Sequence, residues 1–312
     1  METMKAVRIH EYGGPEALRY EDAPRPIVKP DEVLIRVHAA GVNPVDWKVR
    51  QGYAKDMLKY TMPFIPGWDV SGVVEAVGLD TTRLRPGDAV YGRPDISRDG
   101  AYAEYIAVRE SEVALKPKSL DHVQAAAVPL ASLTAWQALF EAAKLEAGQR
   151  VLIHGAAGGV GTFAVQFAHL KGAHVIGTAS AKNHEFLRSL GANETIDYNK
   201  TRFEDVVHDV DVVLDTITGE TMERSWKVLK KGGILVSILQ PPSHEKAASL
   251  GVRCAHVFVQ PSVPQLNEIA KLIDAGKVTV VIEKVFPLWE ARAAHELSAT
   301  GHVRGKIVLR VI

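Results

Sequence analysis

The segment Arg150 to Gly161 reads RVLIHGAAGGVG and has the residue types of a phosphate-binding site. An apolar strand pattern precedes the glycines, and an amphipathic helix pattern follows them. Gly158 and Gly159 would let the backbone approach a pyrophosphate, Gly161 would let the helix pack on the sheet, and the first helical amides would point at the anion. The flanking strand and helix favour a dinucleotide site over a structural turn that binds nothing. We predict cofactor contacts from Gly155, Ala157, Gly158, Gly159 and Val160.

The next strand pattern, His174 to Lys182, bears on which dinucleotide binds. It reads HVIGTASAK and ends without a carboxylate, whereas NAD-binding proteins usually carry an acid there for the ribose diol. Without that acid the site would not repel a 2′-phosphate, so we predict NADPH as the cofactor. The alternative is a solvated Lys182 beside a helix-capping Ser180. The predicted ligands of the phosphate and adenine end are Ser180, Lys182, Asn183 and Tyr198.

The elements that must position these residues change in character along the chain. The first third has short β-branched strand patterns, such as Glu32 to Ala40, separated by Pro and Gly, which indicate a β-rich, barrel-like domain. From about Asp121, strand and helix patterns alternate, which indicates βαβ units and a parallel sheet. The last strand pattern, Lys306 to Val311, again resembles the first third. We predict an α/β protein in which a βαβ domain, residues 121–258, is inserted into a β-rich domain made of residues 1–120 and 259–312.

The composition excludes several classes of function. The 312 residues include 37 Lys and Arg against 37 Asp and Glu, so there is no basic excess to bind nucleic acid or an anionic membrane surface. No apolar run of about 18 residues predicts a membrane span, and no secretory signal is visible. Cys254 is the single cysteine, which precludes an internal disulfide and favours a buried thiol. A cytoplasmic location is the default expectation.

Further motifs resemble the zinc-independent quinone oxidoreductase branch of the medium-chain dehydrogenase/reductase superfamily. This resemblance implies a GroES-like β-rich catalytic domain that encloses a Rossmann domain, with the active site between them. It rests on AGVNPVD (40–46), PFIPG (63–67), GVVE (72–75), RPGDAV (85–90), GAYAEY (100–105), LTA (133–135), the glycine turn and GHVRGKIVL (301–309).

The resemblance also places the zinc ligands of related alcohol dehydrogenases at Asn43, Trp68 and about Leu130. Indole and isobutyl groups cannot bind zinc, and a lone amide is a poor ligand. The hydroxyl relay of those enzymes would fall at Val45, which has no proton to pass. We therefore predict no metal.

Without a Lewis acid the substrate must be electrophilic by itself, as quinones and α,β-unsaturated carbonyls are. The protein would orient it and donate a hydrogen bond to the developing oxyanion. The candidate donors are Asn43, Lys48 and Tyr53. Lys48 could instead be a solvated loop residue and Asn43 a turn former. Asp46 is expected to be structural, since a carboxylate would oppose an oxyanion.

The resemblance implies further cofactor contacts. Thr134 would lie at the nicotinamide end, and Ile217 and Leu239 follow the fourth and fifth strands of the parallel sheet. Arg304 and Lys306 could touch the cofactor phosphate, although Lys306 begins a strand and could simply be exposed. The resemblance also implies a homodimer, formed through the apolar segment Ala255 to Gln260.

Two other functions stay open. An enoyl-thioester reductase of the same superfamily would want a basic surface for its carrier phosphate. An NADPH-binding protein with little catalysis could act as a sensor or a structural protein.

Overall fold

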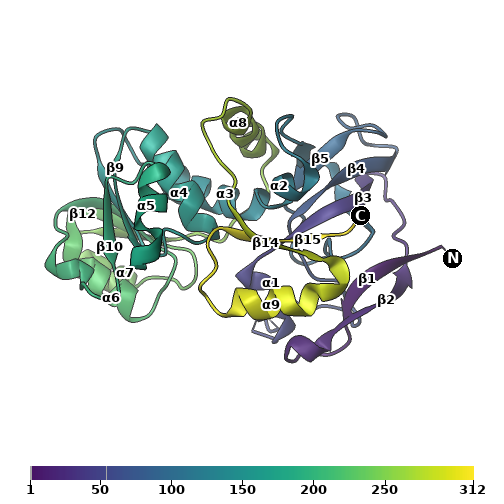
Figure 1. The fold of residues 1–312 in the computed structure, drawn as a ribbon, viewed down its shortest axis with the longest axis horizontal. Helices are drawn as coiled ribbons and strands as arrows, with labels where there is room; N and C mark the ends of the chain where they lie inside the picture. The colour runs from purple at the N-terminus through teal and green to yellow at the C-terminus, as the bar shows by residue number, and fades with distance from the viewer. Residues whose placement is uncertain (1, 54) are drawn as a thin grey trace. The chain divides into compact units, whose positions relative to one another are not determined.

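The computed structural model describes residues 2–53 and 55–312 and divides the chain into two compact units. Unit 1 combines Met1–Leu130 with Pro261–Ile312, and unit 2 is Ala131–Gln260. Unit 1 is the β-rich, GroES-like unit and unit 2 the parallel-sheet Rossmann unit, so the predicted fold class and the insertion of one domain into the other are confirmed. In Figure 1 the purple start and the yellow end of the chain share unit 1.

The main sheet of unit 1 includes strands from both the start and the end of the chain. Within the described residues its strand order is β14-β15-β3-β4-β5-β7, with β6 also paired to β3. The strands are β3 (Glu32–Val42), β4 (Val70–Val77), β5 (Ala89–Gly92), β6 (Tyr105–Arg109), β7 (Val113–Leu115), β14 (Ile282–Pro287) and β15 (Lys306–Arg310). β15 pairs antiparallel with β3, which sets Ile307 opposite Val42. β1 (Thr3–Ile9) and β2 (Leu18–Pro24) form a separate two-stranded sheet.

Alternating apolar side chains of these strands form the core of unit 1. Val33, Ile35 and Val37 of β3 pack with Val70 and the first and last strands, and all are buried. The helices of this unit are α1 (Pro44–Arg50), α2 (His122–Ala126), α8 (Val263–Asp274) and α9 (Ala291–Ala299).

The boundary between the units lies at Leu130, later than the predicted boundary at Leu120. The alanine-rich composition of α2 predicts that this helix opens the Rossmann domain. Instead its residues Ala126 and Ala127 pack with Ala39 of β3 and Val308 of β15, which ties α2 to unit 1. The second boundary lies at Gln260, close to the predicted residue 258.

Unit 2 contains a parallel sheet with the strand order β10-β9-β8-β11-β12-β13 among the described residues. The order reverses between β8 and β11, and in such folds ligands bind beyond the carboxyl ends of the strands near this point. The strands are β8 (Arg150–Ile153), β9 (His174–Ala179), β10 (Glu194–Asp197), β11 (Val210–Asp215), β12 (Leu229–Ser237) and β13 (Arg253–His256). The longest helix of this unit, α4 (Gly159–Leu170), follows β8, and α5 (His184–Ser189), α6 (Glu220–Ser225) and α7 (His244–Ser249) follow later strands (Figure 1).

The apolar segment Ala255 to Gln260, to which the predicted dimer contact is assigned, is strand only as far as His256, where β13 ends at the edge of the sheet. Cys254 is partly buried rather than fully buried, because an edge strand has a neighbour on one side only, and its Sγ lies 3.4 Å from His244 Nδ1. No helix among the described residues has the length and apolar character that crossing a membrane requires.

Candidate active site

Lys306 forms the centre of a buried polar cluster in unit 1. The pairing of β15 with β3 brings its ammonium group to the end of β3, where Nζ donates to Val42 O at 3.1 Å and to Asn43 Oδ1. Nζ also lies 3.2 Å from Asp69 Oδ2, and the two side chains are 4% and 0% exposed. Asp69 accepts two further hydrogen bonds, from Asn43 Nδ2 at 2.8 Å and from Leu130 N at 2.6 Å. We call Asn43, Asp69 and Lys306 the ammonium cluster.

This placement corrects the prediction that Lys306 binds the cofactor phosphate. An ammonium group has three donors, and all three are used inside unit 1. Arg304, its proposed companion, lies on the exposed turn before β15, where its backbone amide donates to Glu283 Oε2 at 3.2 Å.

Asn43 keeps one donor in this arrangement. Its side-chain oxygen accepts from Lys306, and one of the two Nδ2 hydrogens is used by Asp69. The ammonium group polarises the amide, because a hydrogen bond accepted by a carbonyl strengthens the donors at the other end of the group. Asn43 is also the residue directly before the first turn of α1. It therefore has the turn-forming position predicted as its alternative role, in addition to its place in the ammonium cluster.

A second polar chain adjoins Asn43 through Asp46. The Asp46 carboxylate accepts from Asn43 N and from Tyr102 OH, both at 2.8 Å. The Tyr102 hydroxyl lies 3.3 Å from His295 Nε2, and His295 Nδ1 lies 3.4 Å from Arg50 Nη1. Complete burial raises the pKa of Asp46 to about 7, against the lowering effect of its two donors. Asp46 thus caps α1, in the structural role expected of it.

The three predicted oxyanion donors differ in their surroundings. Asn43 is buried in the ammonium cluster. Lys48 lies half-buried on α1, where burial lowers the pKa of its amine and Nζ lies 5.6 Å from the centre of the Trp47 ring. Tyr53 is 76% exposed in the turn after α1. The structure therefore brings only Asn43 into a buried polar site.

Trp68, at one of the positions that the resemblance assigns to a zinc ligand, is part of the core of unit 1. Its ring is fully buried beside Tyr60 and Phe64, and its Nε1 donates to Arg98 O at 3.1 Å. Among the described residues, no group of three or more His, Cys, Asp and Glu is placed to hold a metal ion. Asn43, which stands at one of the positions that the resemblance assigns to zinc ligands, accepts a hydrogen bond from the ammonium group of Lys306.

The glycine turn of unit 2 has the shape of a dinucleotide cradle. Gly155 has φ of +62°, and a Cβ atom at Gly161 would lie 2.3 Å from Gly155 O, so both positions require glycine. At Gly158 a Cβ atom would meet only Gly155 O, at 3.3 Å, and would otherwise project into open space. α4 begins at Gly159 and receives no side-chain cap, which leaves its first amides for a ligand. These residues fit a bound pyrophosphate.

The remaining predicted cofactor residues also belong to unit 2, and most of them follow strands of its parallel sheet. Because the strands are parallel, their carboxyl ends meet at one edge of the sheet. Ser180 follows β9, and Asn183 Nδ2 donates to its Oγ at 3.3 Å. The sequence at the end of β9, Ala179 and Ser180, supplies no carboxylate. Residues from the same edge are Lys182, Tyr198, Ile217 and Leu239, all exposed, and Thr134 lies buried on α3 (Pro129–Trp136).

Sequence reasoning missed a buried imidazole beneath the cradle. His154 precedes Gly155, and its Nε2 lies 2.9 Å from Ser225 Oγ while its Nδ1 lies 3.2 Å from Thr178 Oγ1. Burial lowers the pKa of His154 to about 3, with a further contribution from the charge of Arg224. Tyr102, His295 and Arg50 were also missed, since nothing in their local sequence shows that they meet.

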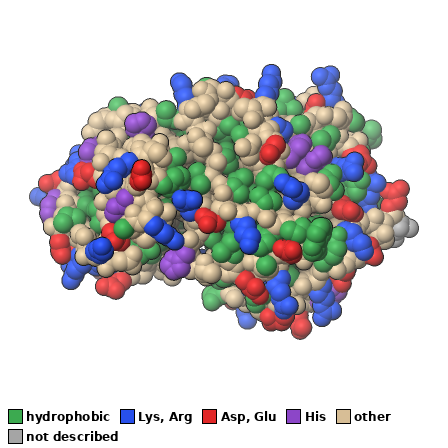
Figure 2. Space-filling model, viewed as in Figure 1, with side chains coloured by type: hydrophobic (Ala, Val, Ile, Leu, Met, Phe, Trp, Pro, Cys, Tyr) green, Lys and Arg blue, Asp and Glu red, His purple; other side chains and the backbone are tan. Residues whose placement is uncertain are grey.

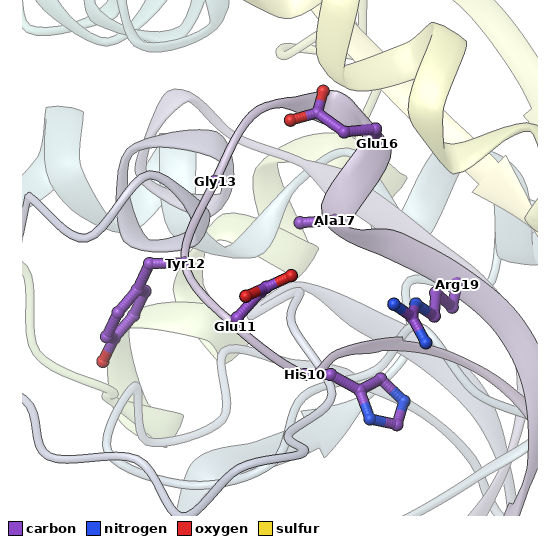
Figure 3. Close-up of a pocket in the computed structure, with 7 residues that line it drawn as sticks. All are labelled: His10, Glu11, Tyr12, Gly13, Glu16, Ala17 and Arg19. Carbon is purple, nitrogen blue, oxygen red and sulfur yellow. The ribbon is translucent and has the colours of Figure 1, made fainter.

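A small pocket elsewhere in unit 1 contains none of these residues. It lies where β1 ends and β2 begins (Figure 3), and it is lined by His10, Glu11, Tyr12, Gly13, Glu16, Ala17 and Arg19. His10 is already engaged there, with its Nε2 2.6 Å from Glu21 Oε1.

Comparisons with known proteins agree with this architecture. The family model of the alcohol dehydrogenase GroES-like domain matches residues 29–118, and the zinc-binding dehydrogenase model matches residues 190–309. The NAD(P)H oxidoreductase RTN4IP1, mitochondrial, of Mus musculus is 37% identical over 99% of this chain and 89% of its own length. The NADPH-dependent alkenal/one oxidoreductase, chloroplastic, of Arabidopsis thaliana is 38% identical over 98% of this chain and 79% of its own length.

Among solved structures, the quinone oxidoreductase of Coxiella burnetii superposes with a TM-score of 0.94 at 37% identity and covers 100% of both chains. A Rossmann unit within a GroES-like unit defines a nicotinamide-dependent oxidoreductase of the medium-chain type. The chain belongs to the zinc-independent quinone oxidoreductase branch of the medium-chain dehydrogenase/reductase superfamily.

Proposed function

We propose that the protein reduces a quinone or an α,β-unsaturated carbonyl with NADPH and without zinc. The observation that carries this proposal is the ammonium cluster. In it Lys306 donates a hydrogen bond to Asn43, at the position that the resemblance assigns to a zinc ligand of alcohol dehydrogenases. A positive charge held there opposes a second cation. With no Lewis acid at this position, the substrate must delocalise the added electron pair by itself, as conjugated carbonyls do.

The residues of the two units have separate tasks in this reaction. In unit 2 the cradle would hold the pyrophosphate, with Ser180 and Lys182 at the 2′-phosphate. When bound, NADPH supplies the hydride. In unit 1 the remaining Nδ2 donor of Asn43, polarised by Lys306, would stabilise the enolate or phenolate oxygen that forms. Water delivers the proton that completes the reduction.

The preference for NADPH rests on the end of β9. Ser180 and Lys182 are polar or positive, and β9 itself ends in Ala179 without a carboxylate. A 2′-phosphate would gain charge-assisted hydrogen bonds at this position.

The test is NADPH oxidation at 340 nm by metal-stripped protein, with quinones, enones and simple aldehydes as acceptors and NADH in parallel. We expect turnover of the conjugated acceptors and faster turnover with NADPH. Activity that returns only on addition of zinc, or that is confined to simple aldehydes, would contradict the proposal. Tight NADPH binding without turnover of any acceptor would favour a sensor or a structural protein.

We also propose that the protein is a homodimer that pairs through the sheet edge at Ala255 to Gln260, the segment in which β13 ends. This strand lies at the edge of the sheet of unit 2, with β12 as its partner on one side. Exposed edge strands readily pair with another chain. Light scattering at micromolar concentration should give twice the mass of the chain, and the mass of one chain would contradict this assembly. The cytoplasmic location stays a prediction, which fractionation of cells would test.

No carrier-binding surface is apparent on the face that Figure 2 shows. Blue Lys and Arg side chains and red Asp and Glu side chains are interspersed over both ends of that face. The equal numbers of basic and acidic residues agree with this distribution.

A further inference from the structure

Arg93 is a buried arginine that forms no ion pair within the described part of the chain. It follows β5 directly and is 3% exposed. Because Gly92 pairs with Val70, Arg93 and Asp69 are cross-strand neighbours at the end of the ladder between β4 and β5. An ion pair between them would be the ordinary outcome. Instead the Nε of Arg93 is enclosed without a hydrogen-bond partner, and the guanidinium pairs with no carboxylate of residues 2–53 and 55–312.

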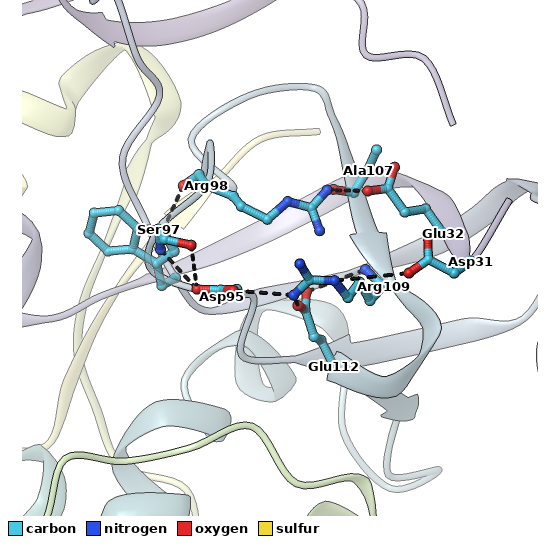
Figure 4. A network of polar contacts seen from close by, with 9 residues as sticks. Asp31, Glu32, Asp95, Ser97, Arg98, Ala107, Arg109 and Glu112 are labelled. Carbon is cyan, nitrogen blue, oxygen red and sulfur yellow. Dashed lines mark hydrogen bonds and ion pairs between the residues drawn. The ribbon is translucent and has the colours of Figure 1, made fainter. Parts of the chain in front are cut away.

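The carboxylates that surround Arg93 are already engaged with other groups. Asp69 is bound by the ammonium cluster and by Leu130 N. Asp95 accepts from Ser97 at 2.9 Å and from Arg109 at 3.2 Å. Glu112 accepts from the same Arg109 nitrogen at 3.2 Å. Figure 4 shows Asp95 and Glu112 both directed at Arg109.

The phenol next to Arg93 offers no partner either. Tyr60 is within electrostatic reach of Arg93, but its hydroxyl donates to Ile96 O. The Tyr60 ring stacks on Phe64 with 4.1 Å between ring centres, so it presents an apolar surface near the guanidinium.

An arginine in this situation lacks an anion. Burying a charge without a partner costs several kcal/mol, and arginine does not escape this cost by losing its proton near neutral pH. Burial lowers the pKa of Arg93 in spite of the three acidic neighbours, so these neighbours do not compensate it. A planar guanidinium binds a carboxylate through two parallel hydrogen bonds.

We propose that Arg93 binds a carboxylate of the substrate, so that the preferred acceptor is an acidic conjugated carbonyl such as a 4-oxo-2-alkenoate. This inference rests on the proposed function and narrows its substrate class. Three acidic neighbours would oppose a doubly charged phosphate more strongly than a singly charged carboxylate. The apolar ring of Tyr60 suits the hydrocarbon part of such a substrate.

The first experiment compares 4-oxo-4-phenylbut-2-enoate with its methyl ester, which lacks the charge. Because the ester also makes the double bond more electrophilic, the ratio of kcat/KM for acid and ester is compared between the wild-type and variant proteins. We expect the wild-type protein to reduce the acid with a kcat/KM about 10- to 100-fold above that of the ester, since hydrogen bonds to a charged group contribute about that factor. Arg93→Met should remove this preference and leave the ester within about threefold. Arg85→Met, on an exposed turn, removes the same charge and should leave the preference intact.

The second experiment does not depend on turnover. Calorimetry would measure the binding of the saturated acid, 4-oxo-4-phenylbutanoate, to NADPH-loaded wild-type and Arg93→Met protein. We expect about 10- to 100-fold weaker binding to the variant, with equal affinity for NADPH.

The outcomes separate this inference from the proposed function. An acid-to-ester ratio of kcat/KM that Arg93→Met leaves unchanged overturns the role of Arg93, and so does a variant that loses NADPH affinity instead of the preference for the acid. Both results leave the reductase standing. Arg93-dependent binding of the saturated acid without reduction of any acceptor supports the carboxylate site and contradicts the proposed reaction.

Discussion

Lys306 and Asp69 form an ion pair that water does not reach, with 3.2 Å between Nζ and Oδ2. Removing one member of such a pair leaves a buried charge alone. We expect Lys306→Met to destabilise unit 1 by about 3–5 kcal/mol. Urea denaturation would measure this loss. Lys271→Met breaks the exposed pair with Glu268 and should cost less than about 1 kcal/mol. Similar losses of unfolding free energy in the two variants would show that the buried ion pair stabilises the protein no more than the exposed one.

Two glycines of the cradle should separate folding from cofactor binding. Gly161→Ala places a Cβ atom 2.3 Å from Gly155 O, so this variant should lower the melting temperature. Gly158→Ala meets Gly155 O only at 3.3 Å, so it should fold while its methyl group occupies the space for the pyrophosphate. We expect NADPH to bind at least about tenfold more weakly to the second variant. Fluorescence titration and thermal melting measure the two effects, and unchanged NADPH affinity in Gly158→Ala would place the pyrophosphate elsewhere.

Lys182 should govern the choice between NADPH and NADH. Its side chain is exposed at the end of β9, where a 2′-phosphate would lie. Lys182→Ala should reduce kcat/KM for NADPH about tenfold and leave the value for NADH unchanged. Lys200→Ala, an exposed lysine beyond β10, is the matched control. An equal loss with both cofactors would mean that Lys182 does not contact the phosphate.

His154 should make the fold sensitive to acid. The pKa of this imidazole is about 3 in the folded chain, against an ordinary value of 6.5 for a solvated histidine, so the unfolded chain binds more protons between these values. Its contribution to stability is therefore lost as the pH falls from 6.5 toward 3, by about 2 kcal/mol at pH 5. Urea midpoints at pH 7.5 and 5.0 should differ less in His154→Asn than in the wild-type protein.

Asp46 acts in the opposite direction, because its raised pKa of about 7 makes the folded chain lose stability as the pH rises from 3.8 to 7. Asp46 is present in both the wild-type protein and His154→Asn, so the difference between their pH responses reports the histidine. His208→Asn, at an exposed position, serves as the control, and an unchanged pH response in His154→Asn would show that folding does not shift the pKa of this imidazole.

Local patterns were sufficient to predict the fold, and they also supplied the candidate residues for the cofactor half of the site. The strand, glycine turn and helix around Arg150 to Gly161 lie close together in the sequence, so this strand, turn and helix could be predicted from local spacing alone. The parallel sheet then followed from the alternation of elements. The boundary at Leu130 could not be predicted, because helix propensity says nothing of which sheet a helix packs against.

The other half of the site depends on contacts between distant residues. Lys306 meets Asn43 because a strand at the end of the chain pairs with one near its start, and no local pattern contains that register. Arg93 has no local signal in the sequence either. Its lack of a partner is a property of the whole neighbourhood, in which each acid has found another donor.

The position of β15 between β14 and β3 also sets an order of assembly during translation. Unit 2 is one continuous stretch, so it can fold while the ribosome is still making the residues after Gln260. The sheet of unit 1 stays incomplete until β15, which ends at Arg310, emerges and pairs with the end of β3. A nascent chain would thus hold a finished nucleotide-binding body before it has the lysine that completes the other unit.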